Sequence, residues 1–237
     1  MMWEKNNNPK LKKNDIDLWL ISTNDYLDNL VDFFLLLSED EKLRANRFYF
    51  EKDKNNFIVT RGILRTLLGK YINQDSDKIT FKYNNYGKPI IISNNIQFNL
   101  SHSKNLVLYG FSENLKLGVD IEFMREKVSY NNIAERFFSD YELKSLNSIP
   151  EPLQKEAFFN GWTRKEAYIK LKEKGLSIPL NSFDVSIIPE QSPLLIDSRD
   201  DDIHFSNWKI FDIKTFKEYK AALITEKNVI SINYHTF

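Results

Sequence analysis

Two carboxylates with the spacing of a β-strand, Asp120 and Glu122, lie in the short segment 118–122 (GVDIE). Side chains two residues apart on a strand point to the same side, so the two carboxylates face one direction. Gly118 removes side-chain bulk beside them. Two negative charges this close repel each other unless a cation lies between them. The segment therefore indicates a cation site, and the alternative is a strand whose outer face is solvated.

A third carboxylate, Glu166, lies in the segment 162–166 (WTRKE) of a predicted helix. Phe159, Trp162, Glu166 and Ile169 repeat at helical spacing and therefore share one stripe. A glutamate within an apolar stripe is costly to bury unless a partner compensates its charge. The alternative is a weak surface ion pair with Lys170, one turn later.

Three carboxylates and a lysine suit a divalent cation that holds a phosphate. Mg²⁺ prefers oxygen ligands and usually takes few protein carboxylates, together with phosphate oxygens and water. We therefore expect Asp120, Glu122 and Glu166 to be metal ligands, with Mg²⁺ as the ion and Mn²⁺ as the alternative. The reaction class that fits is metal-dependent transfer of a phosphoryl-type group.

A segment of hydroxyl and imidazole groups, 101–103 (SHS), follows an alternating run that predicts a strand. Its side chains suit the recognition of a phosphate. A nucleophile–base pair is the other interpretation, but Ser101 and His102 are adjacent on a strand and so point to opposite sides. No glycine-rich elbow surrounds either serine, and the chain lacks a P-loop, a dinucleotide-binding glycine motif and an HExxH motif. Hydrolase chemistry is therefore disfavoured.

The elements that must position these residues occur twice in the same order. In the first half, alternation predicts strands, and a capping box at 38–41 (SEDE) predicts the start of a helix. The predicted elements are a strand at 15–22, helices at 38–50 and 56–72, and strands at 79–83, 96–100 and 106–111, with a turn at 86–89 (YGKP).

The second half repeats this order, with another capping box at 139–142 (SDYE) and with Gly175 placed to end the long helix. The predicted elements are a strand at 115–123, helices at 130–138, from 139 and at 153–174, and strands at 183–188, 205–213 and 221–224. We therefore predict an α+β fold of two pseudo-symmetric halves, 1–113 and 114–237, packed side by side with the active site at their interface. The alternative is a single irregular α+β domain.

The composition is that of an ordinary globular protein of 237 residues, with 42% hydrophobic and 28% charged residues. Its 33 basic and 33 acidic side chains cancel, which argues against a nucleic-acid partner. The absence of cysteine excludes disulfides and thiolate metal sites and favours a cytoplasmic location. No apolar run reaches the roughly 18 residues of a membrane helix. The polar segment 1–14 lacks the apolar core of a signal peptide, so no membrane partner is expected.

Three segments in order, 98–103 (FNLSHS), 118–122 (GVDIE) and 162–170 (WTRKEAYIK), resemble the signatures of the 4'-phosphopantetheinyl transferases. The resemblance is to the surfactin-synthetase-activating type, in which one chain carries both pseudo-symmetric halves. It spans residues 38–183, and the further segments that agree are 47–49 (RFY), 86–89 (YGKP), 136–139 (RFFS) with Glu142, and 174–177 (KGLS). Each segment alone is a weak signal, but three in order at family-like spacing are specific.

The resemblance implies transfer of the 4'-phosphopantetheine arm of coenzyme A to a serine of an apo acyl or peptidyl carrier protein, releasing adenosine 3',5'-bisphosphate. It implies that Asp120, Glu122 and Glu166 hold Mg²⁺ against the diphosphate of coenzyme A. Contacts to coenzyme A are implied at Arg44, Tyr86, Gly87, Lys88, Ser101, His102, Asp120, Glu166 and Lys170, with Ser101 and His102 at the 3'-phosphate. The implied catalytic residues are Glu166, Asp120 and Lys170, with Glu166 accepting the serine proton directly or through water.

One position departs from the family pattern. The phosphate-binding helix of the family often carries a lysine where this chain has Glu41. Arg44 and Arg47, one and two turns later, are the expected replacements. The alternative for both arginines is a solvated helix face.

The implied protein partner is a carrier protein, which is typically acidic and helical. Zero net charge excludes global attraction by a cationic enzyme, so Arg125 and Lys127, just after the carboxylate strand, are the predicted docking residues. The single-chain type implies a monomer that serves antibiotic or nonribosomal-peptide biosynthesis. The alternatives are a binding module that has lost turnover and a metal-dependent nuclease, but a nuclease needs a basic track for the nucleic-acid backbone, and none is evident.

Overall fold

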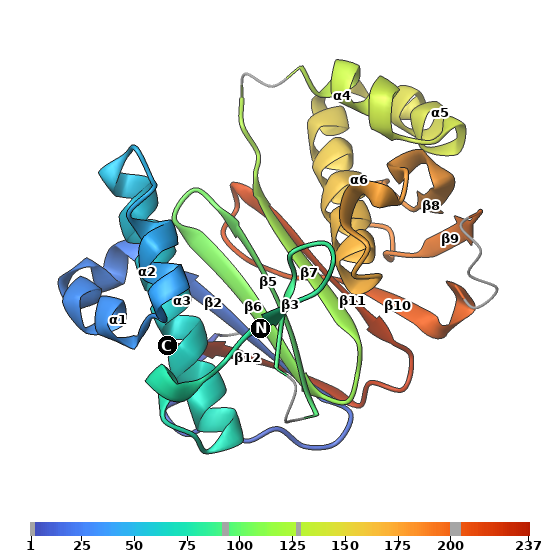
Figure 1. Ribbon diagram of the computed structural model, residues 1–237. Coiled ribbons are helices and arrows are strands. Elements are labelled where there is room, and N and C mark those ends of the chain that lie inside the picture. Colours follow the sequence, from blue (N-terminus) through green and yellow to red (C-terminus); the bar gives the residue numbers. More distant parts are fainter. Residues whose placement is uncertain (1–2, 92–94, 127–128, 200–204) are drawn as a thin grey trace.

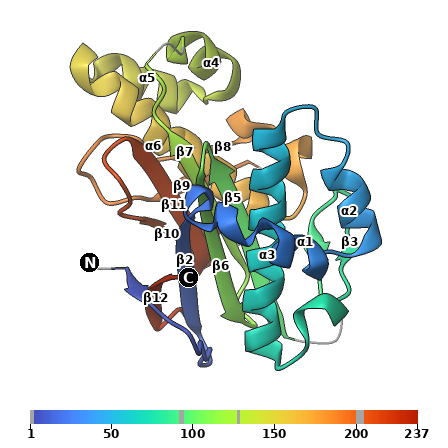
Figure 2. The ribbon, with the colours of Figure 1, turned by 90° about the vertical axis from the view of Figure 1, so that its left-hand side faces the viewer.

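Two β-sheets lie face to face in the middle of the molecule, and helices cover both outer faces (Figures 1 and 2). The structure is a computed structural model that describes residues 3–91, 95–126, 129–199 and 205–237. The first sheet has the strand order β1 (Glu4–Lys5), β12 (Ser231–Thr236), β2 (Asp15–Ser22), β6 (Leu106–Glu113) and β5 (Ile96–Ser103). The second sheet has the order β10 (Trp208–Asp212), β11 (Tyr219–Glu226) and β7 (Leu117–Phe123).

The helices form the outer layers of each half. On the first sheet lies α3, and α1 and α2 pack against that helix; α6 covers the second sheet, and α4 and α5 pack against α6. The bounds are α1 (Leu30–Leu36), α2 (Glu39–Ala45), α3 (Glu51–Ile72), α4 (Tyr130–Phe137), α5 (Asp140–Ser148) and α6 (Glu151–Leu171). Two hairpins, β3 (Lys82–Tyr83) with β4 (Pro89–Ile90) and β8 (Phe183–Val185) with β9 (Leu195–Ser198), complete the part of the chain that the structure describes. The predicted α+β class is confirmed.

Strand β2 is buried on both faces because it lies between α3 and the second sheet. Trp19 and Ile21 belong to the apolar cluster that β2 shares with α3, and Ile16, Leu18 and Leu20 belong to the cluster between the sheets. A strand covered on both sides is expected to be apolar throughout, and the segment DIDLWLIS meets this expectation apart from Asp15, Asp17 and the final serine.

Strand β7 divides its side chains as the alternation predicted. Leu117, Val119 and Ile121 pack between the two sheets, so Asp120 and Glu122 point to the opposite side, toward α6. That side is not a solvated outer face, because Asp120 is only 2% exposed.

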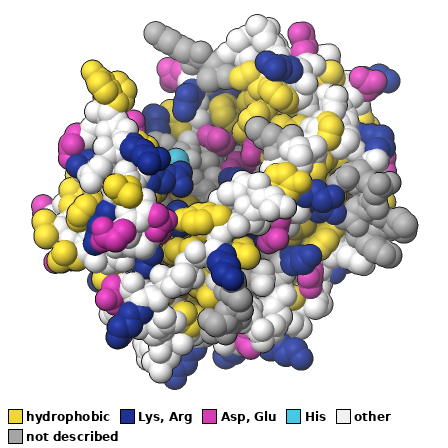
Figure 3. Space-filling model, in the orientation of Figure 1, with side chains coloured by type: hydrophobic (Ala, Val, Ile, Leu, Met, Phe, Trp, Pro, Cys, Tyr) yellow, Lys and Arg dark blue, Asp and Glu magenta, His cyan; other side chains and the backbone are white. Residues whose placement is uncertain are grey.

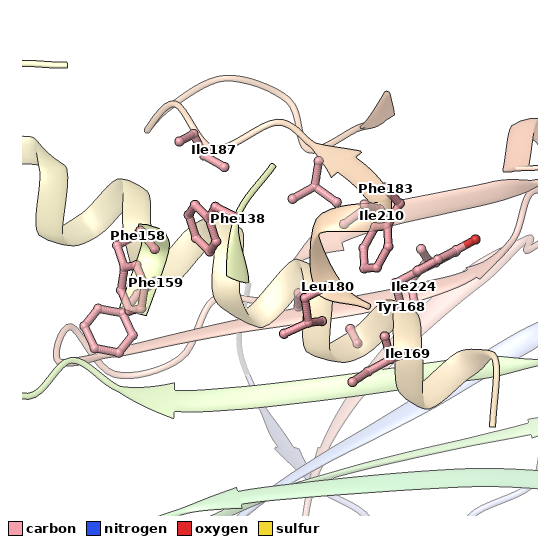
Figure 4. Close-up of a cluster of buried hydrophobic side chains, with 14 of the residues drawn as sticks. Phe138, Phe158, Phe159, Tyr168, Ile169, Leu180, Phe183, Ile187, Ile210 and Ile224 are labelled. Carbon is pink, nitrogen blue, oxygen red and sulfur yellow. The ribbon is translucent and has the colours of Figure 1, made fainter. Parts of the chain in front are cut away.

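Helix α6 is the centre of the second apolar core (Figure 4). Phe158 and Tyr168 pack with Phe138 and Phe183, and Ile210 and Ile224 of the second sheet close the cluster. Because elements surround the helix on several sides, its apolar residues do not form a single stripe.

The two cations of the WTRKE segment belong to the fold. Lys165 is fully buried, pairs with Glu142 of α5 at 2.7 Å, and donates to the carbonyls of Leu180 and Phe183. Arg164 is equally buried and forms a two-bond ion pair with Asp212 of β10. Breaking a fully buried pair such as Lys165 with Glu142 costs about 3–5 kcal/mol, whereas Asp212 is half-exposed and its pair with Arg164 contributes less.

Both predicted capping boxes are present, at Ser38 with Glu41 and at Ser139 with Glu142. The helix predicted over 38–50 nevertheless ends at Ala45, because the chain turns there and Phe50 adopts an extended conformation; α3, predicted to begin at 56, begins at Glu51. The long helix ends at Leu171 because Glu173, with φ 58°, lies in the left-handed region before Gly175 is reached.

Several predicted strands are shorter or differently bounded. The segment 79–83 forms a strand only at Lys82–Tyr83, and the segment predicted at 205–213 begins with a 3-10 turn, Phe205–Asn207. Neither α1 nor the 3-10 helix before it, Thr23–Asn29, was predicted from the sequence. The apolar residues of this region include exposed side chains such as Val31 and Leu35, so it lacks a clean amphipathic period.

Strand β12 was not predicted, and it pairs in parallel with β2 of the first sheet. The C-terminal segment therefore adds a strand to the N-terminal half, across the boundary predicted between 113 and 114. Hydrogen bonds to the buried Asp17 of β2 hold this strand in place. The Asn233 amide of β12 donates to Asp17 at 2.9 Å, and the Tyr71 hydroxyl of α3 donates to the same carboxylate at 2.6 Å. Among the described residues, no helix has the length and apolarity of a membrane span.

Gly118 allows β7 to lie directly against α6. A Cβ at this position would lie 2.0 Å from the Ala167 carbonyl oxygen and 2.6 Å from the Leu171 nitrogen. Both atoms belong to the helix backbone, so neither can move aside as a flexible side chain would. The close approach brings the Asp120 side of the strand to the Lys170 side of the helix.

We expect Gly118→Ala to destabilise the protein by about 3 kcal/mol, because the methyl group forces the strand away from the helix. Urea denaturation of both proteins measures this loss. The control is Lys116→Ala at an exposed position beside the same strand, which should change the free energy of unfolding by less than about 0.5 kcal/mol. Equal effects of the two substitutions would show that Gly118 is not required for the contact.

Candidate active site

The facing strands β5 and β7 belong to different sheets and are joined by side chains. The Asn99 amide oxygen accepts a hydrogen bond from the Val119 N–H at 3.0 Å, and the Ser103 hydroxyl accepts one from the Phe123 N–H at 3.0 Å. Between them, Ser101 donates to Asp120 at 2.7 Å. We call these three alternate β5 residues, Asn99, Ser101 and Ser103, the polar seam. The seam lies where the two halves meet, as the sequence predicted for the active site.

Asp120 is the centre of a hydrogen-bonded chain. Its Oδ1 accepts from the Ser101 hydroxyl and from the Lys170 ammonium, the latter at 2.6 Å. Lys170 Nζ also donates to the Ser101 Oγ at 2.9 Å. The other carboxylate oxygen, Oδ2, is buried and has no hydrogen-bond partner within the described residues. Lys170 therefore binds a carboxylate of β7. The alternative, a weak surface ion pair confined to Lys170 and Glu166 of the same helix, does not account for this contact.

The neighbouring carboxylates carry uncompensated negative charge. Burial, followed by the charge of Asp120, raises the pKa of Glu166 to about 7, although Lys170 opposes the shift. Burial and the charge of Asp120 also raise the pKa of Glu122, despite a hydrogen bond of 2.9 Å from Ser103. Partly buried carboxylates with raised pKa values, next to a further negative charge, attract a cation.

The three carboxylates do not form a complete set of metal ligands. In the described part of the chain, no group of three or more His, Asp or Glu side chains is arranged so that it could hold a metal ion. The physical reason is visible at two of them: Lys170 holds Asp120, and Ser103 holds Glu122. The buried, unpartnered Oδ2 of Asp120 nevertheless fits a cation that takes few protein ligands.

A first cavity of about 260 Å³ lies beside this cluster. The predicted residues Tyr86, Gly87 and Lys88 line it together with Lys170. The turn that carries them is held by Asn84, whose Oδ1 accepts from the Tyr86 and Lys88 N–H groups, and Gly87 adopts a φ of 81° that favours glycine. The lining of the first cavity also includes Phe98, Asn99, Leu100, Ile169, Glu173 and Gly175.

A second cavity of about 620 Å³ lies between α3 and the end of β5, and the two cavities share Leu100. Of the predicted residues, Arg44, His102, Glu122 and Arg125 line it. Figure 3 shows a hollow between the two halves, with acidic side chains on its floor and basic side chains on the side of α2 and α3. The desolvating walls and the nearby Lys170 charge lower the pKa of His102, although its ring keeps access to solvent.

The remaining predicted residues are placed as follows. Glu41 is buried, and Arg47 is exposed and outside the lining of both cavities. Lys127 lies outside the described residues. Arg61 also lines the second cavity and was not predicted as a site residue. The signal that could have found it is a charged residue between Ile58 and Leu64 in the apolar part of a helix.

Family models match both parts of the chain. A family model described as "4'-phosphopantetheinyl transferase superfamily" matches residues 116–224, and one described as "4'-phosphopantetheinyl transferase, N-terminal" matches residues 24–112. The chain is 35% identical over 188 residues to the 4'-phosphopantetheinyl transferase HetI of a Nostoc species, covering 78% of this chain and 79% of that protein. It is 33% identical over 156 residues to the 4'-phosphopantetheinyl transferase Sfp of Bacillus subtilis, covering 65% and 68%.

A solved holo-(acyl-carrier-protein) synthase from Bacillus anthracis, in complex with coenzyme A (3',5'-ADP), is also similar. Its TM-score is 0.38 at 19% identity, and the match covers 47% of this chain and 94% of that one.

We expect Glu166→Gln to stabilise the metal-free protein at pH 8 and not at pH 4.5. The folded-state pKa of about 7 exceeds the ordinary value of 4.5, so the folded state binds the extra proton and loses stability as the pH rises through that window. Removing the charge should recover on the order of 2 kcal/mol at pH 8, or roughly 4–8 °C in Tm. The measurement is a thermal melt in EDTA at both pH values.

The control is Glu135→Gln, an exposed residue of α4. It removes the same charge from the surface and should shift Tm equally at the two pH values. A Glu166→Gln shift that is also independent of pH would refute the assignment of a raised pKa.

Proposed function

The chain belongs to the 4'-phosphopantetheinyl transferase superfamily, and from this premise we propose that the cluster of Ser101, Asp120, Glu166 and Lys170 is where the transfer occurs. The reaction moves 4'-phosphopantetheine from coenzyme A to a serine of an apo carrier protein. The serine oxygen bonds to the phosphorus that bears the pantetheine, and that phosphorus loses its bond to the bridging oxygen. The leaving group is adenosine 3',5'-bisphosphate, and the serine proton goes to a base.

The observation that carries the proposal is the buried Asp120, with one oxygen held by Lys170 and the other without a partner. Asp120, Glu122 and Glu166 are proposed to hold Mg²⁺, or alternatively Mn²⁺. The bound ion would supply charge neutralisation on the diphosphate. Burial, followed by the negative charge of Asp120, raises the pKa values of Glu122 and Glu166, and a bound cation would offset both effects, which supports this assignment.

Lys170 and Lys88 are proposed to bind the diphosphate in the first cavity. Both line that cavity, and the Lys170 side chain is 27% exposed, so its ammonium reaches both Asp120 and the cavity. Hydroxyl attack on a diphosphate depends mainly on positioning and on preorganised positive charge. The turn at Tyr86, Gly87 and Lys88 would carry the nucleotide along the same wall.

Glu166 is proposed to accept the serine proton, directly or through water. A base with a pKa near the working pH balances basicity against the fraction that is ionised, and the pKa of about 7 in the metal-free protein meets this condition. A bound cation lowers the basicity of a carboxylate that ligates it, so the two proposed roles of Glu166 compete.

The proposed partner is an acyl or peptidyl carrier protein, and the enzyme is proposed to act as a monomer. Arg125 lines the second cavity beside Glu122 and stands at the mouth of the site, which supports its role in docking an acidic carrier.

We expect the purified protein to add one phosphopantetheine group to an apo carrier in the presence of coenzyme A and Mg²⁺, as read by intact mass. EDTA should abolish the gain, and Mg²⁺ should restore it. Asp120→Ala should lower the rate by at least about 100-fold, because it removes both the counter-ion of Lys170 and the proposed metal ligand.

The control is Asp197→Ala. Asp197 is a half-exposed residue that pairs with Arg199, far from the polar seam in sequence and fold, so this variant should retain the activity. Circular dichroism would confirm that both variants are folded. A wild-type protein that modifies none of several carriers would favour a binding module, and an Asp120→Ala variant within a few-fold of wild type would remove Asp120 from the chemistry.

A further inference from the structure

The turn that carries Lys88 belongs to neither the first nor the second sheet. Among the described strands, β3 and β4 pair only with each other, so no backbone ladder fixes their hairpin to the rest of the protein. At its base, the Phe81 ring lies 6.0 Å from the ring of Phe98 in β5. A two-stranded hairpin is only marginally stable alone, so the position of its tip, residues 84–88, depends on side-chain contacts.

Two contacts join this tip to Glu173, which follows α6. The Lys88 ammonium donates to the Glu173 carboxylate at 2.8 Å, and the Asn84 amide donates to the Glu173 carbonyl oxygen at 3.1 Å. Asn84 also accepts from the N–H groups of Tyr86 and Lys88 within the tip. Glu173 thus holds both the charged end of the tip and the residue that organises its backbone.

Glu173 has a backbone conformation that is unfavourable for glutamate. Its φ of 58° lies in the left-handed region, at the position just after the cap of α6, where glycine is usual. Strain of this kind persists where other contacts compensate for it, and it is common at ligand-binding sites. The contact that the Glu173 side chain makes is its ion pair with Lys88.

Neither stability nor charge balance explains the glutamate. The side chains of Lys88 and Glu173 are 18% and 37% exposed, and a pair exposed to solvent in this way adds little to the stability of a fold. Both residues line the first cavity, and a carboxylate on the wall of an anion-binding cavity weakens binding by its own charge.

Holding a lysine in place does explain it. A lysine side chain loses much conformational freedom when it is fixed, and a contact that fixes it before the ligand binds removes this cost from binding. The Lys88 ammonium has three N–H donors. Glu173 accepts from one of them, so two remain for phosphate oxygens.

We propose that Glu173 is a positioning residue, which holds the 84–88 tip against the end of α6 and orients the Lys88 ammonium toward the diphosphate of coenzyme A. This inference rests on the proposed function and adds to it a residue that acts through Lys88. The strained backbone of Glu173 is then the condition for placing a carboxylate beside that lysine.

The test compares the wild type with Glu173→Gln and Glu173→Gly. Glutamine keeps the length and an oxygen acceptor but loses the charge, whereas glycine loses the side-chain contact and keeps the carbonyl that Asn84 uses. We expect Glu173→Gly to raise the Kd of coenzyme A by about fivefold, the effect of ordering one long side chain. Glu173→Gln should raise it by a smaller factor. Titration calorimetry with Mg²⁺ and without a carrier protein measures both.

Further measurements separate this role from a structural one. In the transfer assay, KM for coenzyme A should rise with kcat unchanged. Glycine adopts the left-handed conformation without strain, so Glu173→Gly should melt no lower than the wild type. Hydrogen exchange of residues 84–88 in the ligand-free protein should become faster, because the tip is no longer held. A lower Tm with a loss in kcat, or unchanged exchange, would refute the positioning role.

Lys88→Met tests whether Glu173 acts through Lys88. In this background, Glu173→Gly should change the Kd by less than about twofold, whereas two independent residues would give the full loss again. The matched control is Asp75→Asn, which removes the carboxylate of an exposed ion pair with Lys78, outside the lining of the first cavity. It should leave the Kd unchanged.

The direction of the change in Kd decides the proposal. A role of Glu173 through its charge alone predicts tighter binding of coenzyme A in both variants, and this result or an unchanged Kd would overturn the proposal. If the wild type modifies no carrier but the Kd rises as expected in the variants, the proposed function fails and the positioning role stands. If the wild type modifies carriers and Glu173→Gly keeps the wild-type Kd, the function stands and the positioning role is refuted.

Discussion

The edge strands β5 and β7 meet through side chains where a continuous sheet would place a backbone ladder, and the rest of the site depends on this contact. The polar seam supplies an acceptor to the Val119 and Phe123 N–H groups, which would otherwise lack partners at a sheet edge. The same seam donates to Asp120 and Glu122. One row of small polar side chains therefore joins the halves and fixes two carboxylates at their boundary.

The cluster around Asp120 destabilises the protein when no ligand is bound. Gly118 brings β7 against the backbone of α6, so Asp120 is buried and Glu122 and Glu166 are partly buried, with Lys170 as their nearby cation. One ammonium group cannot neutralise three carboxylates, and burial together with the charge of Asp120 raises the pKa values of Glu122 and Glu166. Proteins retain such destabilised groups chiefly where a ligand restores the charge balance.

Signals that act within a few residues could be interpreted from the sequence alone. The capping boxes at Ser38 and Ser139 and the alternation of β7 are set by local geometry, and the structure contains all of them. The parallel pairing of β12 with β2 and the partners of Lys165 join segments far apart in the chain. No local period encodes such contacts, because they depend on where the remaining elements place the two segments.

Net charge was a poor guide to the site, and the alternation of β5 explains why. Successive side chains of this strand point to opposite sides, so Ser101 reaches the Asp120 cluster and His102 reaches the basic cavity with Arg61. Ser103 and Glu122 line the same second cavity as His102 and Arg61, so acidic and basic side chains meet at the end of β5. Their charges cancel in the total, and the net charge of the chain therefore gives no information on how the site is charged locally.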